Sequence, residues 1–268
     1  MPVVDVNGAR LWYDEAGQGP AVVLLHGDLG DSGLWEPVVP FLAERFRTIR
    51  TDFRFYGRSV GPLAPFSYHA DVLGTLDELA IERAALVGLS LGGSVALDLA
   101  LDHPDRVWAV AGVAPALSGH EAAAYSEAQE AAYEAALAER DVEAAREIDL
   151  AVWAPLGADE RIRRLWHATP DADPLPPGCE SRLPARPARQ RLGELRVPAL
   201  VVTVAHDPPG FREIGPLVAR EAPGARHVEL DSDRYVTLRE PELLARTLVA
   251  FLAEAATVSG GPSPLLRR

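Results

Sequence analysis

Ser90 is the residue whose setting best suits chemistry. It stands in the motif Gly88-Leu89-Ser90-Leu91-Gly92, between an apolar run that predicts a strand over 84–89 and a spacing that predicts a helix over 91–103. A tight turn between such elements needs glycines where side chains would collide with backbone, and it pushes the serine outward. The start of the helix also favours negative charge nearby. The pattern predicts a serine nucleophile; a strand–turn–helix with a chance serine is the structural alternative.

A second loop, His26-Gly27-Asp28, follows the apolar run over 21–25. A loop in this place can supply one backbone N–H of an oxyanion hole, and the residue after the nucleophile supplies the other. We therefore expect the amides of Asp28 and Leu91 to be the two donors. The Asp28 carboxylate would repel an oxyanion if it faced the site. Alternatively, it points to solvent or caps the helix near Ser32.

Strands and helices alternate along most of the chain. Two short alternating runs around Asn7-Gly8 predict a hairpin. Later apolar runs, among them 107–113 and 199–204, predict buried strands. Most of these runs are followed by a stretch in which apolar residues recur at the spacing of a helix. This alternation predicts an α/β fold with a mostly parallel, doubly wound sheet that starts with an antiparallel hairpin.

Residues 115–196 interrupt the alternation. They begin with a helical stretch rich in alanine and glutamate, and they end in a proline-rich run over 170–187. We expect a helical cap over 115–196, inserted into a core formed by 1–114 and 197–256. Residues 257–268 are expected to be a flexible tail.

The order of these features resembles the α/β-hydrolase superfamily. The resemblance rests on the His26-Gly27 loop, the segment from Asp52 to Ser59, the Ser90 motif, and Asp207 after a late strand. It covers most of residues 1–114 and 197–254. It implies the α/β-hydrolase fold, with Ser90 as the nucleophile and Asp207 as the acid of a catalytic triad.

The resemblance also implies a histidine base in the loop over 230–241, where this chain carries Arg234. Arginine keeps its proton, so it cannot accept one from Ser90. Arg234 could pair with Asp207, or it could present its guanidinium to an anionic group of a ligand. A surface arginine in a misaligned loop is the structural alternative. On the first two readings the triad is degenerate, with arginine at the histidine position.

Three functions are compatible with these residues. The first is an enzyme that acts on a small carbonyl-bearing molecule, aromatic or polyketide-like, by cyclisation, isomerisation or lyase chemistry, with an oxyanion hole and Arg234 in place of an intact triad. The second is a carboxylic-ester hydrolase in which a non-standard base, such as His120 or His167 of the cap, activates Ser90. The third is a pseudo-hydrolase that binds a ligand without turnover.

The substrate pocket is expected to draw on the loops around Ser90 and on the cap. Aromatic side chains in the cap could contact a ring-bearing ligand, although plain packing would also account for them. The residues expected to contact substrate are His26, Gly27, Phe55, Tyr56, Trp153, Trp166 and His167.

Composition narrows the function classes. The net charge of −13 argues against nucleic acid and anionic membrane surfaces as partners, and a small molecule is the expected partner. The chain has no lysine, which excludes a lysine Schiff base. A lone cysteine, Cys179, and the lack of a signal-peptide pattern favour the cytoplasm. We expect no metal and no cofactor, because neither a ligand cluster nor a dinucleotide motif is present.

Overall fold

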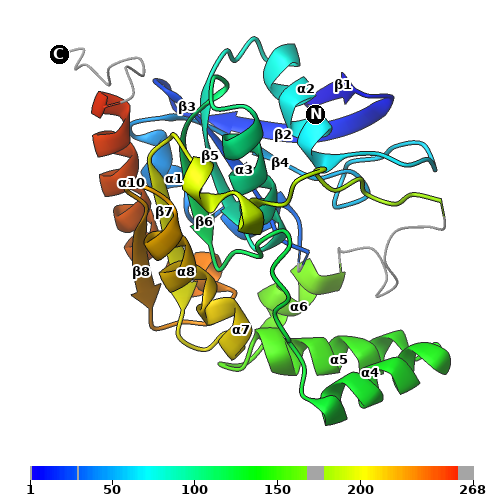
Figure 1. Cartoon of the computed structure of the whole chain (residues 1–268). Coiled ribbons are helices and arrows are strands. Elements are labelled where there is room, and N and C mark those ends of the chain that lie inside the picture. The colour runs from blue at the N-terminus through cyan, green and yellow to red at the C-terminus, as the bar shows by residue number, and fades with distance from the viewer. Residues whose placement is uncertain (1, 29, 168–177, 259–268) are drawn as a thin grey trace.

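An eight-stranded sheet forms the centre of the protein (Figure 1). The computed structural model describes residues 2–28, 30–167 and 178–258. The strand order is β1-β2-β4-β3-β5-β6-β7-β8, with β1 and β2 antiparallel to their neighbours and parallel pairing from β4 onward. The strands are β1 Val3–Val6, β2 Ala9–Ala16, β3 Ala21–Leu25, β4 Arg47–Thr51, β5 Ala84–Leu89, β6 Val107–Val113, β7 Ala199–Val204 and β8 Arg226–Leu230. The predicted fold class is therefore confirmed.

The first hairpin turns at Asn7-Gly8, as its sequence predicts. Both residues have positive φ, 50° and 76°, which is the conformation that a two-residue hairpin turn requires. Antiparallel pairing of Val6 with Ala9 closes the turn. The hairpin adds β1 and β2 at one edge of the sheet, beyond the parallel strands that carry the site.

Helices cover both faces of the sheet. One core cluster includes residues of α1 (Val39–Ala43) and α10 (Pro241–Val258), and the other includes residues of α2 (Tyr68–Glu78), α3 (Leu91–Asp102) and α8 (Ile214–Glu221). Each cluster takes alternate residues of the central strands, such as Leu24 in one and Leu25 in the other. Because both faces are covered, the strands are continuously apolar, as expected of a parallel sheet.

The insertion between β6 and β7 begins with three helices: α4 (Glu127–Ala138), α5 (Val142–Trp153) and α6 (Glu160–His167). They gather at one end of the molecule in Figure 1, close to α7 (Pro209–Arg212). Ser126 begins α4 with a capping box, and Asp141 caps α5. Leu150, Ile162 and Trp166 join the core cluster that contains α10, so the insertion shares a core with the sheet domain.

Two helices expected from the spacing are broken by proline. The helical spacing over 35–45 gives a 3-10 turn at Ser32–Trp35 and then α1, because Pro37 and Pro40 lack the amides that a continuous helix needs. Pro216 has the same effect within 211–221, which divides into α7 and α8.

At the C-terminal end, α10 extends through Thr257 and Val258, two residues that were expected to belong to the flexible tail. The rest of the expected tail lies outside the described residues, as do residues 168–177 of the proline-rich run.

Candidate active site

Ser90 lies at a strained turn between β5 and α3. Its φ of 52° and ψ of −115° are unusual for a residue with a side chain. A Cβ on Gly88 would lie 2.0 Å from the carbonyl oxygen of Gly92, and one on Gly92 would lie 2.4 Å from the carbonyl oxygen of Leu25. These backbone contacts explain why glycine occupies both positions. The turn holds the Ser90 hydroxyl at the carboxyl end of the central strand, which is the geometry of a nucleophile elbow.

Arg234 lies between Ser90 and Asp207. Its Nη1 donates a hydrogen bond of 2.8 Å to Ser90 Oγ. Its Nε and Nη2 donate to the two oxygens of Asp207, at 3.1 and 2.8 Å. The side chains of Arg234 and Asp207 are each only 3% exposed. The three residues thus form one buried hydrogen-bonded row, although their positions in the sequence are far apart.

Two aromatic rings pack against the Arg234 guanidinium. The rings of Trp153, from α5, and Phe211, from α7, each have their centroid 4.3 Å from its central carbon. The rings also meet edge to face, with centroids 5.3 Å apart. Stacking of this kind is favourable for a guanidinium that has left water. The insertion therefore contributes directly to the environment of Arg234.

Opposing effects act on the ionisation of Asp207. Burial raises the pKa of this carboxyl above its usual range, while the paired Arg234 guanidinium works in the other direction. The carboxyl of Asp233 adds to the upward effect. Arg234 is thus the positive charge that compensates the buried Asp207 carboxyl, with Asp233 as a second acid close by.

The loop of His26, Gly27 and Asp28 lies against the Ser90 turn. A Cβ on Gly27 would come within 2.8 Å of Ser90 Cβ, and the amide of Gly92 donates to the carbonyl of His26. The Asp28 side chain accepts a 2.7 Å hydrogen bond from Tyr56 Oη. The cap of the turn at Ser32 is Asp31, whose side chain accepts from Gly33 N. Asp28 is therefore not the helix cap, and its amide remains a predicted oxyanion donor.

The backbone amides at the Ser90 turn have distinct partners. The amides of Ser90, Gly92 and Gly93 donate to the carbonyls of Val113, His26 and Ser90. Leu91 begins α3, so its N–H points along the start of the helix. The Leu91 amide remains the second predicted oxyanion donor.

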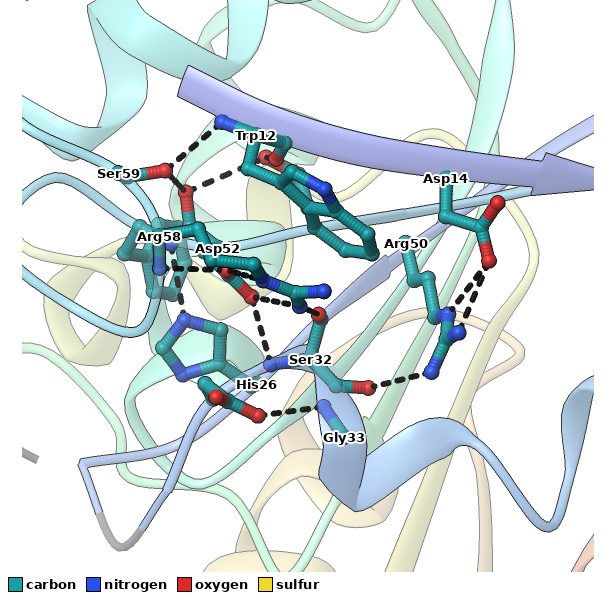
Figure 2. Close-up of polar contacts among 12 residues, drawn as sticks. Trp12, Asp14, His26, Ser32, Gly33, Arg50, Asp52, Arg58 and Ser59 are labelled. Atoms are coloured by element: carbon teal, nitrogen blue, oxygen red, sulfur yellow. Dashed lines mark hydrogen bonds and ion pairs between the residues drawn. The ribbon is translucent and has the colours of Figure 1, made fainter. Parts of the chain in front are cut away.

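A buried polar network fixes the loop that carries Asp28 (Figure 2). Asp52 is fully buried and accepts hydrogen bonds from the amide of Ser32 and from both the amide and the side chain of Arg58. Burial alone would raise the pKa of Asp52, but the bonds from Arg58 and Ser32 lower it below its usual range. The charged carboxylate thereby ties the segment after β3 to the segment after β4.

His26 has a structural place in the same network. Its Nε2 accepts from the amide of Phe53 at 2.8 Å, and its Nδ1 lies 2.8 Å from the carbonyl of Gly27. This arrangement requires the neutral ring with the proton on Nδ1. Burial lowers the pKa of His26, which also keeps the ring neutral. Both ring nitrogens are occupied, so His26 orients the loop beside Ser90.

The other histidines near the site are bonded elsewhere. His206 Nε2 pairs with Asp231 at 3.0 Å, His227 Nε2 pairs with Thr203 at 2.7 Å, and His120 Nε2 lies 3.2 Å from the carbonyl of Gly210. The His167 ring contacts the Arg146 guanidinium at an exposed position. None of these contacts joins a histidine to Ser90 in the described part of the chain.

The remaining residues expected to contact substrate have different surroundings. Phe55 has a positive φ of 70° and packs edge to face on Phe66. Tyr56 is buried with its ring against His26, and burial together with Asp28 raises its pKa well above the usual range. Trp166 is 7% exposed and belongs to the shared core. The structure thus brings Trp153 and Tyr56 to the site, while Trp166 packs inward; their contact with substrate stays a prediction.

Sequence reasoning missed two features of the site. Phe211 is the second ring that packs against the Arg234 guanidinium, and Asp149 of α5 accepts a hydrogen bond from Tyr125 Oη. Burial raises the pKa of Asp149 to about 6. A buried acid in an otherwise apolar stretch, one turn before Trp153, was the available signal for Asp149. Phe211 carried no signal in the sequence alone.

A cavity of about 550 Å³ lies between the insertion and the loop that carries Asp207. Its walls include Tyr125, Val152 and Pro155 on one side, and Asp207 and Pro208 on the other.

Within the described residues, no group of three or more histidine, cysteine, aspartate or glutamate side chains is placed to hold a metal ion. No helix in the same part of the chain has the length and apolarity to cross a membrane.

Comparison with known proteins identifies the family. The family model described as alpha/beta hydrolase fold matches residues 20–157, so the chain belongs to the α/β-hydrolase fold family. Over nearly its whole length the chain is similar to a putative carbamate hydrolase, RutD, of Azorhizobium caulinodans, at 28% identity covering 95% of this chain and 99% of that protein.

The solved structures give the same result. The enol-lactonase from Burkholderia xenovorans LB400 is 28% identical, with a TM-score of 0.67 over 94% of this chain and 99% of that one. Several curated relatives match over only part of the chain. The chain spans about a third of the length of some curated relatives that it matches, such as an uncharacterised protein of Mycobacterium bovis that is 41% identical over 108 residues, 38% of this chain and 31% of that protein.

Proposed function

We propose that the chain is an enzyme that acts on a small carbonyl compound at Ser90, and that Arg234 stands where the family places its catalytic histidine. The hydrogen bond from Arg234 Nη1 to Ser90 Oγ carries this proposal. Asp207 holds the guanidinium from the other side, as the triad acid would hold an imidazole. The insertion over 115–196 then acts as a cap that closes the site.

Arg234 changes what the Ser90 hydroxyl can do. A guanidinium only donates hydrogen bonds, so it cannot take the proton that a serine nucleophile must lose. Losing the base of a serine hydrolase costs about 10⁶ in turnover, and what remains is roughly 10³–10⁴ over water. Since Ser90 Oγ accepts from Arg234, its own proton is directed to another acceptor. That acceptor is the carbonyl oxygen of the substrate.

Ser90 therefore serves as a donor together with the amides of Asp28 and Leu91. Three donors around one oxygen stabilise negative charge that develops there during reaction. This arrangement suits reactions that pass through an enolate or a similar anion, which are cyclisation, isomerisation and lyase reactions. The charge on Arg234 polarises the Ser90 hydroxyl and strengthens its hydrogen bond to the developing anion.

Hydrolysis of an ester or lactone is the second candidate, and the comparisons favour it. The enol-lactonase and the putative carbamate hydrolase cover nearly the whole chain. In this case a base other than histidine would have to reach Ser90, or water would have to attack a carbonyl held by the donors. A ligand-binding protein without turnover is the third candidate, and ligand-dependent thermal stabilisation without conversion of the ligand would support it.

A fluorophosphonate probe tests the choice, because it labels only an activated serine. The wild-type protein is expected to remain unlabelled and to hydrolyse p-nitrophenyl acetate at the rate of Ser90→Ala. Stoichiometric labelling that disappears in Ser90→Ala would overturn the first candidate and establish the second. Labelling of a serine other than Ser90 is excluded as an artefact by mapping the modified peptide.

A further inference from the structure

A second buried arginine–carboxylate pair lies next to Arg234. Asp233 is fully buried, and its Oδ1 and Oδ2 accept hydrogen bonds of 2.7 and 2.8 Å from Nε and Nη2 of Arg239. We infer that Arg239 is a positioning residue: by neutralising Asp233 it leaves Arg234 bound to Asp207 and Ser90, and the Asp233–Arg239 pair also joins this loop to the cap. The inference rests on the proposed function only for its consequence in catalysis; the positioning itself is a property of the free protein.

The pair joins two segments that carry the site. The amide of Leu156 donates to Asp233 Oδ2 at 3.2 Å, and Arg239 Nη2 also donates to the carbonyl of Gly157. Both residues follow closely on Trp153, the last residue of α5. On the other side, Asp233 directly precedes Arg234 in the chain. The Asp233–Arg239 pair thus links the segment that follows Trp153 to the segment that carries Arg234. The side chains of these two segments, the Trp153 ring and the Arg234 guanidinium, stack on each other.

The charges explain why a second arginine is needed. Asp233 lies near enough to Asp207 to raise the pKa of that carboxyl. Two buried carboxylates therefore compete for guanidinium groups in the same region, and an unpaired buried carboxylate is costly. Because Arg239 neutralises Asp233, Arg234 is left to bind Asp207 and to donate to Ser90. Without Arg239, the Arg234 side chain would be drawn toward Asp233 and away from Ser90.

The backbone supports this division of partners. The amide of Tyr235 donates to Asp233 Oδ1 at 3.1 Å, which turns the chain immediately after Arg234. The side chain of Arg239 lies one turn further along and is 21% exposed. It reaches Asp233 from the solvent side, whereas Arg234 points inward. Each arginine therefore has its own carboxylate: Arg234 binds Asp207 and Arg239 binds Asp233.

Arginine side-chain ¹⁵N–¹H NMR tests the inference without a substrate. Buried, paired guanidinium groups exchange slowly with water and give separate signals; the Arg234 signal is assigned by its loss in Arg234→Lys. The Arg54–Asp71 pair, 2% and 3% exposed, is the matched internal reference. In Arg239→Gln the Arg234 Nε signal is expected to shift or broaden while the Arg54 signal stays in place. Arg239→Lys is expected to restore part of the Arg234 signal, because it keeps the charge.

A double variant separates positioning from simple support. In Asp233→Asn/Arg239→Gln the competing carboxylate is gone, so the Arg234 signal is expected to return to its wild-type position even if the melting temperature falls further. An unchanged Arg234 signal in Arg239→Gln, or no recovery in the double variant, would overturn the inference. If Arg239→Gln does not fold under ordinary conditions, the spectra are recorded at lower temperature with a stabilising osmolyte, where the same two outcomes decide. Fluorophosphonate labelling of wild-type Ser90 would defeat the proposed function and leave these NMR outcomes unaffected.

Discussion

Arg234 donates from Nη1 to Ser90 Oγ at 2.8 Å while its other two nitrogens bind Asp207. Each of the three guanidinium nitrogens thus donates a hydrogen bond, one to the serine and two to the acid. The rings of Trp153 and Phe211 pack against the guanidinium, each with its centroid 4.3 Å from the central carbon. Such a fully engaged arginine is a fixed part of the site, which makes its replacement informative.

Arg234→His should introduce serine-hydrolase activity. An imidazole at this position would have Asp207 on one side and Ser90 on the other, which are the two partners that a catalytic histidine needs. A positioned general base contributes about 10²–10⁴ to the rate. We therefore expect the hydrolysis of p-nitrophenyl acetate to rise by this factor over wild type, together with fluorophosphonate labelling of Ser90.

The control for this gain is the double variant Arg234→His/Ser90→Ala, which should return to the wild-type rate and show no labelling. A gain that survives removal of Ser90 would mean that the new imidazole acts on its own. An absence of any gain in a folded Arg234→His variant would show that the site is remodelled beyond the single substitution.

Asp207→Asn should destabilise the protein strongly. It leaves the buried Arg234 guanidinium without its carboxylate, and breaking a buried pair in this way costs about 3–5 kcal/mol. Urea unfolding measures the loss. The paired replacement Asp207→Leu/Arg234→Met removes both charges and should recover most of the free energy of unfolding. If the single and the double variant are equally unstable, the ion pair is not the cause.

Asp149 should make stability depend on pH. Its folded pKa of about 6 lies above the ordinary value of 3.8, so the folded state favours the protonated form. The resulting stabilisation is complete below 3.8 and is lost as the pH rises through 6. Between pH 4.5 and 7.5 the wild type should lose about 2 kcal/mol of unfolding free energy relative to Asp149→Asn. Urea unfolding at the two pH values tests this, and an equal difference at both would contradict it.

Gly88→Ala should disrupt the Ser90 turn. The new methyl group would meet the backbone of Gly92 and Gly93 at 2.0 to 2.4 Å, and neither can move without displacing α3. We expect a loss of about 3 kcal/mol or more in thermal or urea unfolding. Gly193→Ala is the matched control, since its nearest contact is 3.8 Å away, and it should change stability by about 0.5 kcal/mol or less. Equal effects of the two substitutions would show that crowding is not the reason for Gly88.

Much of the fold could be predicted from local patterns. The strands over 21–25, 84–89 and 107–113 have the predicted bounds, because continuous apolar runs between turn residues leave little choice of register. Proline positions accounted for the divided helices but were not used in the prediction. The site residues were harder, because the contact between Arg234 and Ser90 joins positions 144 residues apart. Only the resemblance to a family brought them together.

The insertion was the least predictable part. Its helical character followed from composition, but the placement of Trp153 over Arg234 depends on how α5 packs against α7, and no sequence pattern encodes that contact. The pairing of Asp233 with Arg239, the last residue of a short helix (Val236–Arg239), was also missed, since two charged residues six positions apart are usually solvated. Long-range packing, and not local propensity, decides these features.

The strands that flank the insertion are hydrogen-bonded neighbours, with Val113 of β6 beside Val202 of β7. Because the two strands are parallel, the chain leaves β6 at Val113 and enters β7 at Ala199, which lies beside Val110 and about 11 Å from the exit. A crossover of some kind must join these two points, but its length and its helices can change while the strand pairing is preserved. Ligand choice can thus diverge through this one segment, while the turn at residue 90, which β5 and α3 build, is retained.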